Sequence, residues 1–183
     1  GEILIKIKEK DCLDLISILK EQGTEAIAVS FINSYANPEN ERLVASILRK
    51  YLHGIFVTES SALIPERGEF ERSSTAVLNA YLSPVMTEYL DMLDQELIDQ
   101  GVSAPVNIMG SNGGAMTLQV AAQRCASTFL SGPVGGVVGS IDIAKSSELH
   151  DIITFDMGGT STDVALVHQL IPRMSHDNQI DAF

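Results

Sequence analysis

The chain has 183 residues and a formal net charge of −12, from 12 Lys and Arg against 24 Asp and Glu. That length suffices for one sizeable domain or two small ones, and a composition of 45% hydrophobic and 20% charged residues excludes the disordered, collagen-like and coiled-coil classes. The acidic balance leaves no broad basic face for nucleic acid, and no apolar stretch approaches the ~18 residues of a membrane span, so we expect neither partner.

The ends and the cysteines give two further expectations. The chain starts at Gly1 without an initiator Met or a signal-peptide pattern, which predicts an internal fragment of a longer protein. Cys12 and Cys125 lie too far apart in sequence for a disulfide framework or a CxxC metal site. We therefore expect two buried free thiols in a cytoplasmic protein.

The first part of the chain alternates strand and helix patterns. The predicted elements are a strand at residues 3–7, a helix capped by Asp11 and ended by Gly23, a buried strand at residues 26–31, a helix opened by Asn37 and Pro38, and a strand at residues 55–58. This alternation predicts a partly parallel sheet covered by helices, which is an α/β architecture.

The second part begins with a long helical pattern. We expect a helix over residues 69–100 that Pro84 kinks or divides, with a solvated, charged entrance at residues 65–74 and caps at Ser73 or Ser74. After it we expect a strand at 106–109, a glycine-rich turn at 110–114, a helix at about 118–124, a glycine-rich helix at 133–145 capped by Ser131, and strands at 151–156 and 162–167.

The turn between the last two strands carries the clearest chemistry. Gly158 and Gly159 let the backbone approach an anion closely, and the amides of such a turn form an anion-binding concavity. The hydroxyls of residues 160–162 (Thr160, Ser161 and Thr162) add donors. Because Asp156 and Asp163 would repel a phosphate, their natural role is to hold Mg²⁺ against its oxygens, directly or through water.

The alternative interpretation is an ordinary β-hairpin whose glycines make a tight turn. The segment is not a Walker A loop, which needs a Lys, nor a dinucleotide-binding fingerprint, because a strand follows rather than a helix. The aspartates on both sides of the turn favour the functional interpretation.

Two weaker features are rich in glycine. Ser131, Gly132, Gly135 and Gly136 lie at the start of a predicted helix, where amides receive anions, but their spacing equally suits close helix packing. Asn112, Gly113 and Gly114 follow a strand and would meet a ligand there or form a plain turn. The four histidines, His53, His150, His168 and His176, have no metal-ligand spacing, and we assign them no role.

Residues 155–164 (FDMGGTSTDV) and 130–139 (LSGPVGGVVG) resemble the hydantoinase A/5-oxoprolinase family, as do residues 28–38, 71–82 and 111–114. The resemblance implies a ribonuclease-H-like, actin-like ATPase fold with a mixed sheet and covering helices. It also implies ATP- and Mg²⁺-dependent opening of cyclic amides such as 5-oxoproline or hydantoins, with a hydantoinase B-like subunit or domain as partner. Residues 65–70 depart from the family pattern, which puts a role for Arg67 and Gly68 in doubt.

By this resemblance, residues 156–163 are the second of two phosphate hairpins. Residues 1–130 would be the C-terminal part of a first domain, and residues 131–183 would open a second. Asp156 and Asp163 would then be catalytic, Asp156 would bind the metal, and the three glycine-rich segments would bind nucleotide. We expect little catalysis from this chain alone. The alternatives are an acetone-carboxylase-like subunit, a small-molecule kinase, and a non-catalytic subunit that docks a partner.

Overall fold

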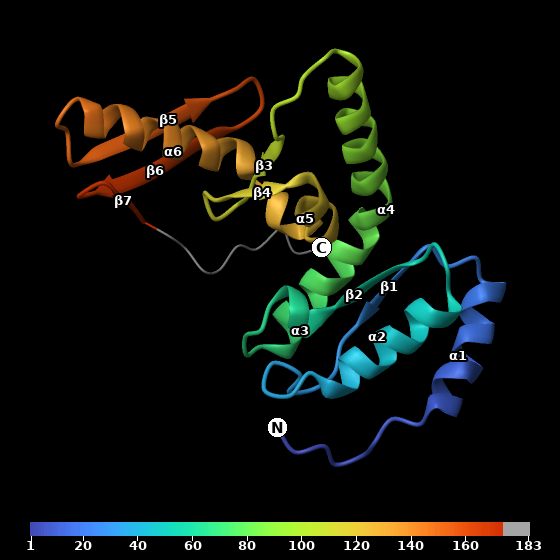
Figure 1. The fold of residues 1–183 in the computed structure, drawn as a ribbon. Helices are drawn as coiled ribbons and strands as arrows, with labels where there is room; N and C mark the ends of the chain where they lie inside the picture. The colour runs from blue at the N-terminus through green and yellow to red at the C-terminus, as the bar shows by residue number, and fades with distance from the viewer. Residues whose placement is uncertain (174–183) are drawn as a thin grey trace. The chain divides into compact units, whose positions relative to one another are not determined.

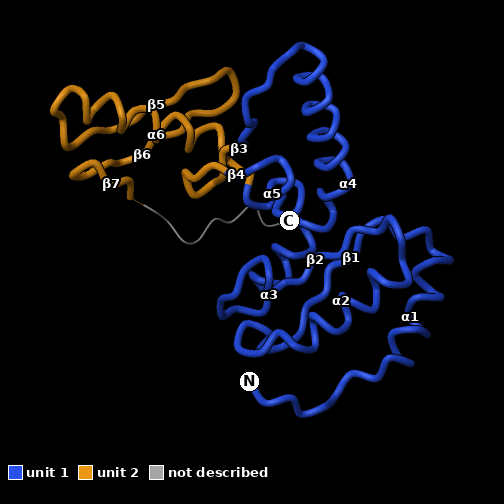
Figure 2. The backbone as a smooth tube through the Cα atoms, viewed as in Figure 1, with its two compact units in different colours: residues 1–108, 116–127 blue, residues 109–115, 128–183 orange. Residues whose placement is uncertain are grey.

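The computed structural model describes residues 1–173 and divides the chain into two units (Figure 2). Unit 1 comprises residues 1–108 and 116–127, and unit 2 comprises residues 109–115 together with the chain from residue 128 onward. Unit 2 therefore includes a short loop that unit 1 flanks on both sides in the sequence.

Figure 1 labels the helices and strands. Up to residue 101 they are α1 (Glu9–Glu21), β1 (Ala26–Val29), α2 (Glu39–Tyr51), β2 (Phe56–Glu59), α3 (Ser60–Leu63) and α4 (Glu69–Asp99). Then follow β3 (Asn107–Met109), β4 (Ala115–Thr117), α5 (Leu118–Gln123), the 3-10 helix η1 (Cys125–Thr128), α6 (Ser131–Ser146), β5 (Ile152–Met157), β6 (Thr162–His168) and β7 (Ile171–Pro172).

Unit 1 is built on two parallel strands. β1 pairs with β2 from Ala26↔Phe56 to Val29↔Glu59, and α2 connects them. Both α2 and α4 pack on this pair, and Figure 1 shows the strands between them. The core on the α1 and α2 side consists of Cys12, Ile16, Val29, Ile47, Leu48 and Leu52. The predicted α/β alternation with a parallel pairing is thus confirmed, and both cysteines are free and buried as expected.

A buried polar network ties the layers of unit 1 together. The Glu41 carboxylate on α2 is fully buried and accepts hydrogen bonds from the Phe31 amide at 2.8 Å, from Ser60 Oγ at 2.6 Å, and from the amide and hydroxyl of Ser61 at 2.8 and 2.6 Å. Arg72 on α4 donates through Nε to Ser60 Oγ at 3.1 Å and through a terminal nitrogen to the Phe31 carbonyl at 2.9 Å. The two charged groups therefore meet through shared partners rather than directly.

The N-terminal segment differs from the prediction. Residues 3–7 form no strand, although they alternate, because no described strand pairs with them; Leu4 and Ile5 stay 89% and 80% exposed. Helix α1 begins at Glu9 after an extended Lys8, so Asp11 is not the N-cap. Asp11 lies in the first helical turn, where a carboxylate interacts favourably with the helix dipole.

Helix α4 differs from the predictions mainly at its start. Pro84 does not divide the helix, which runs from Glu69 to Asp99 with Pro84 inside it, and the alternative that Pro84 kinks it stays a prediction. It begins after Gly68, whose φ of 108° suits glycine, so Ser73 and Ser74 lie inside the helix and cap nothing. The predicted solvated entrance is wrong at Arg72, which is 1% exposed because carbonyls and hydroxyls of three other segments surround its guanidinium.

Unit 2 contains an antiparallel sheet in the order β5-β6-β7. β5 pairs with β6 from Ile152↔Val167 to Met157↔Thr162, which confirms the two strands predicted at the end of the chain. Helix α6 packs against β5 and β6. On the strand face that includes Ile153 and Phe155, these side chains are 69% and 65% exposed.

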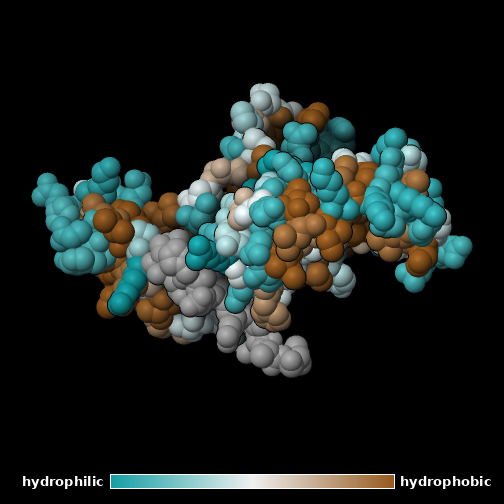
Figure 3. All heavy atoms as spheres, turned by 90° about the horizontal axis from the view of Figure 1, so that it is seen from below, coloured by the Kyte–Doolittle hydropathy of each residue, from teal (hydrophilic) through white to brown (hydrophobic). Residues whose placement is uncertain are grey.

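Apolar side chains reach the surface of the chain in several places. Figure 3 shows brown, apolar residues gathered beside teal, hydrophilic ones on one face. Within residues 1–173, no helix is both long and apolar enough to cross a membrane.

Candidate functional site

The glycine-rich turn joins β5 and β6 as a tight hairpin. Met157 pairs with Thr162 at the end of the ladder, and the Gly158 amide donates to the Ser161 carbonyl at 3.0 Å across the turn. The strand propensity of residues 152–157 and 162–168 builds the two arms, and the glycines make the reversal. The anion-binding interpretation and the ordinary-hairpin interpretation both require this hairpin. The backbone amides and side chains of the turn that have no partner within the hairpin decide what the turn can bind.

Those free groups are hydrogen-bond donors. Among the described residues, nothing accepts a hydrogen bond from the amides of Gly159, Thr160 or Ser161. The side chains of Thr160, Ser161 and Thr162 are exposed, and a Cβ at Gly159 would meet nothing within 4 Å. A turn with several outward amides and hydroxyls and no obstructing side chain offers an anion the contacts it needs.

The two aspartates face each other across the hairpin. Asp156 and Asp163 are direct partners in the ladder, so their side chains leave the same face of the sheet. Like charges directly opposite each other on a sheet are destabilising, and a bound cation would remove that repulsion. Asp156 is exposed and Asp163 is half-buried.

These residues fit a magnesium ion shared with a phosphate better than a dedicated metal cage. Residues 1–173 contain no group of three or more His, Cys, Asp or Glu that could hold a metal. Mg²⁺ is commonly bound by one or two carboxylates together with phosphate oxygens and water, and one such pair is what the hairpin provides.

Helix α6 lies directly beside Asp156. A Cβ at Gly136 would stand 3.8 Å from Asp156 Oδ2, and one at Gly135 would stand 3.9 Å from Met109 Cγ. These two glycines therefore bring α6 close to β5 and to the end of β3. At Gly132 a Cβ would meet nothing within 4 Å. Ser131 is the first helical residue and not a cap, because the preceding Leu130 takes the left-handed N-cap position with φ 55°.

The 110–114 turn packs on the same helix. Gly113 has φ +80°, and a Cβ there would stand 3.2 Å from Val138 Cγ2 and 3.7 Å from Val134 Cγ1. Asn112 Oδ1 accepts a hydrogen bond from the Gly114 amide at 2.9 Å, so this oxygen stabilises its own turn. The structure thus brings all three predicted segments together around α6 within unit 2, although the space next to the Gly132 Cα is open.

His168 lies at the end of β6 away from the glycine-rich turn. His168 Nδ1 lies 2.7 Å from Asp151 Oδ1, an exposed pair at the other end of the β5–β6 ladder. The backbone amide of Gln169 and then His168 hold the pKa of Asp151 below its usual range. The fourth histidine, His176, lies outside the described residues.

Sequence reasoning missed two features of unit 1. One is the Glu41 network, where burial raises the pKa of Glu41 but hydrogen bonds from Ser60 and Ser61 outweigh it and lower the pKa overall. The other is a pocket of about 830 Å³ formed by β2, α3, α4, α5 and Arg49 of α2, with no residue of the hairpin, α6 or the 110–114 turn in its lining. The only signal of this pocket in the sequence is the helical spacing that puts Asp91 and Asp94 on the same face of the predicted helix as Ser83 and Thr87.

Family models match most of the chain. The hydantoinase/oxoprolinase model matches residues 72–183, and the hydantoinase/oxoprolinase N-terminal region matches residues 1–52. The chain belongs to the hydantoinase/oxoprolinase family. The first match includes all three glycine-rich segments of unit 2, and the resemblance noted from the sequence is confirmed.

Curated relatives place different activities in this family. The chain is 35% identical to the caprolactamase subunit alpha of Pseudomonas jessenii over 82% of this chain and 22% of that one. It is 32% identical to the acetone carboxylase beta subunit of Xanthobacter autotrophicus over 92% and 24%, and 36% identical to the 5-oxoprolinase of Saccharomyces cerevisiae over 90% and 13%. The chain therefore spans about a quarter or less of the length of these relatives.

A solved structure supports the fold. A nucleotide-free structure of acetone carboxylase, from a study of ATP-dependent acetone carboxylation, matches with a TM-score of 0.75 and 31% identity over 93% of this chain and 25% of that one. This likeness confirms the predicted fold class. Relatives in this family act on cyclic amides or are carboxylase subunits, and several are subunits of multi-subunit enzymes.

Proposed function

We propose that this chain carries a phosphate-binding hairpin of an enzyme that opens cyclic amides with ATP and Mg²⁺. The observation that supports it most is the 157–162 turn, with its outward amides and hydroxyls beside the facing Asp156 and Asp163. The caprolactamase and 5-oxoprolinase relatives support a cyclic amide as substrate.

In this proposal the hydrogen-bond donors of the turn bind the phosphate, and the carboxylates bind the metal ion. The amides of Gly159 and Thr160 and the neighbouring hydroxyls would donate to phosphate oxygens, while Asp156 would hold Mg²⁺ with Asp163 directly or through water. ATP, when bound, supplies a phosphoryl group to the amide oxygen, so that water breaks the ring C–N bond and an amino acid, ADP and phosphate leave, with two waters consumed in total. Gly136 would keep α6 clear of the Asp156 carboxylate.

The test is ATP hydrolysis by the full-length protein with its partner subunit, with and without caprolactam, 5-oxoproline and a set of hydantoins. We expect one ring to stimulate turnover, and Asp156→Ala to reduce that turnover at least 100-fold. Asp142→Ala, which removes an exposed carboxylate from α6 in the same unit, is the matched control and should keep full activity. Turnover retained in Asp156→Ala would refute the assignment.

A carboxylase is the second candidate. The likeness to acetone carboxylase in both sequence and structure favours it, and the same hairpin would serve ATP in either reaction. ATP turnover that depends on bicarbonate and a ketone, with no ring dependence, would select this candidate. ATP turnover that depends neither on a ring nor on bicarbonate and a ketone would favour a small-molecule kinase. No ATP turnover at all would favour a non-catalytic docking subunit.

The partner is part of the proposal. Relatives named as alpha, beta and gamma subunits support assembly with other chains, and we expect a hydantoinase B-like subunit or domain. Co-purification of the full-length protein with such a subunit, and loss of ring-dependent turnover without it, would test this part separately.

A further inference from the structure

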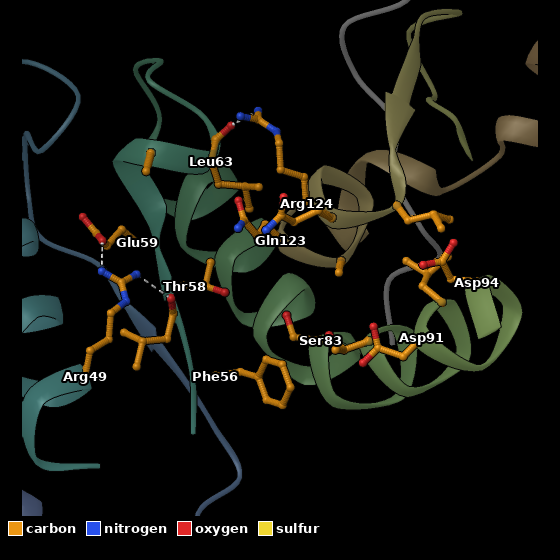
Figure 4. Close-up of a pocket in the computed structure, with 17 residues that line it drawn as sticks. Arg49, Phe56, Thr58, Glu59, Leu63, Ser83, Asp91, Asp94, Gln123 and Arg124 are labelled. Carbon is orange, nitrogen blue, oxygen red and sulfur yellow. Dashed lines mark hydrogen bonds and ion pairs between the residues drawn. The ribbon is translucent and has the colours of Figure 1, made fainter. Parts of the chain in front are cut away.

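The pocket in unit 1 lies between several elements. β2, one face of α4, and α5 with the following Arg124 supply most of its lining, residues of α2 and α3 complete it, and Figure 4 shows these side chains around the hollow. Its volume of about 830 Å³ lies in the range of small-molecule sites. All of its lining residues belong to unit 1.

The α4 wall changes character along the helix. Ser83, Thr87, Leu90, Asp91 and Asp94 follow one another at helical spacing and line the pocket from the middle of α4 toward its C-terminal end. Ser83 and Leu90 are buried at 3% and 2% exposure, whereas Asp91 and Asp94 are exposed. The wall therefore passes from a hydroxyl-bearing and apolar floor to two carboxylates.

Those carboxylates lack a cationic partner. No described Lys, Arg or His pairs with Asp91 or Asp94, and the last turn of α4 contains no basic residue. Asp91 and Asp94 are three residues apart on one face of α4, and like charges that are neighbours on a helix repel each other. A cationic group bound beside these aspartates would relieve that repulsion.

The α5 side supplies the opposite charge. Arg124 follows α5 and donates one hydrogen bond, from a terminal nitrogen to the Leu63 carbonyl at 2.7 Å, and it forms no ion pair with the rest of residues 1–173. A guanidinium has five donors in a planar fork, so Arg124 keeps donors for a carboxylate. The other arginine of the pocket, Arg49, is already neutralised by Glu59 at 2.6 Å.

We propose that this pocket binds a linear amino acid, with its ammonium group against Asp91 and Asp94, its carboxylate against Arg124, and its carbon chain along Leu90 and Ala122. The lining carries the assignment: it has two carboxylates on α4 and one guanidinium after α5, all three exposed and without an ion-pair partner among residues 1–173, together with the apolar Leu90 and Ala122. Binding here needs no nucleotide. Hydrolysis of a cyclic amide releases molecules of this class, so a role as a product site, unlike the binding itself, rests on the proposed function.

Isothermal titration of the 183-residue chain with 6-aminohexanoate tests the proposal, with hexanoate and hexylamine as single-charge probes. We expect a dissociation constant of about 0.1–1 mM for the zwitterion and at least tenfold weaker binding of either probe. Glutamate and 4-aminobutanoate in the same titration report the preferred chain length. No binding of any amino acid, or equal binding of hexylamine and 6-aminohexanoate, would overturn the proposal.

Variants locate the binding site. Asp91→Asn combined with Asp94→Asn, and Arg124→Gln separately, should each weaken 6-aminohexanoate at least tenfold, while Arg124→Lys should retain more affinity than Arg124→Gln. Glu88→Gln removes an exposed carboxylate of α4 outside the pocket and should change nothing. Circular dichroism verifies that each variant is folded. Unaltered binding in the folded double variant would refute the site, and because no ATP is present, that failure is separable from failure of ring opening.

Discussion

Glu41 is a fully buried carboxylate in unit 1 on which several hydrogen bonds converge. Its two carboxylate oxygens accept four hydrogen bonds from three residues, and no part of the side chain reaches solvent. In Glu41→Gln the amide nitrogen would face donors, so at least one buried donor loses its partner. We expect a loss of about 2–4 kcal/mol in the free energy of unfolding, measured by urea denaturation. Asp14→Asn on the exposed side of α1 should stay within about 0.5 kcal/mol, and an equal effect of both changes would contradict this account.

The same carboxylate predicts how stability depends on pH. The hydrogen bonds from Ser60 and Ser61 outweigh burial and hold the pKa of Glu41 below its ordinary value of 4.5. The unfolded chain therefore binds this proton more readily, so the stabilisation is fully present above pH 4.5 and is lost as the pH falls through the lower folded pKa. Urea midpoints measured from pH 7 to pH 3 should fall more steeply in the wild type than in Glu41→Gln. If the urea midpoints of the wild type and of Glu41→Gln fell in parallel with pH, Glu41 would already be protonated in the folded protein at pH 7, which would contradict this account.

The 110–114 turn depends on glycine at position 113, where a side chain would not fit against α6. Gly113→Ala introduces a methyl group at φ +80° and 3.2 Å from Val138, which combines backbone strain with a steric clash. We expect a loss of about 1–3 kcal/mol and faster hydrogen exchange in residues 109–115 and in α6. Gly54→Ala is the matched control, because Gly54 has the same φ of +80° with nothing within 4 Å of the added atom. Val138→Ala should recover part of the loss in Gly113→Ala but none in Gly54→Ala.

Elements with strong local signals were predictable, and those that need distant partners were not. The β5–β6 hairpin, α2 and the length of α4 follow from periodicity and turn residues. Residues 3–7 have the alternation of a strand, but a strand also needs a neighbour to pair with, and the pattern does not encode one. The burial of Arg72 depends on carbonyls 6 and 41 residues away, which local charge pairs cannot indicate.

At the scale of the whole chain, the candidate site was predictable as segments but not as an assembly. Because turn chemistry is local, the sequence alone predicts that Gly158 and Gly159 meet an anion and that Asp156 and Asp163 hold a cation beside it. It left open whether the glycines of α6 serve a ligand or packing, and the structure places Gly135 and Gly136 in packing contacts beside Asp156 and Met109. The predicted domain boundary between residues 130 and 131 stays a prediction.

The division into units predicts how that boundary behaves when the chain is cut. Unit 2 includes residues 109–115, whose Gly113 backbone packs on Val134 and Val138 of α6. A piece that starts at residue 128 keeps α6 and the hairpin but loses this cover, so its helix should exchange amide hydrogens faster than in the intact chain. Hydrogen exchange with mass analysis compares α6 and β5–β6 in both molecules. We expect the strands to keep most of their protection, since their ladder is complete within the piece, while residues 134–138 lose at least tenfold. Equal protection of α6 in both molecules would mean that the second domain starts at residue 131 and folds without the turn.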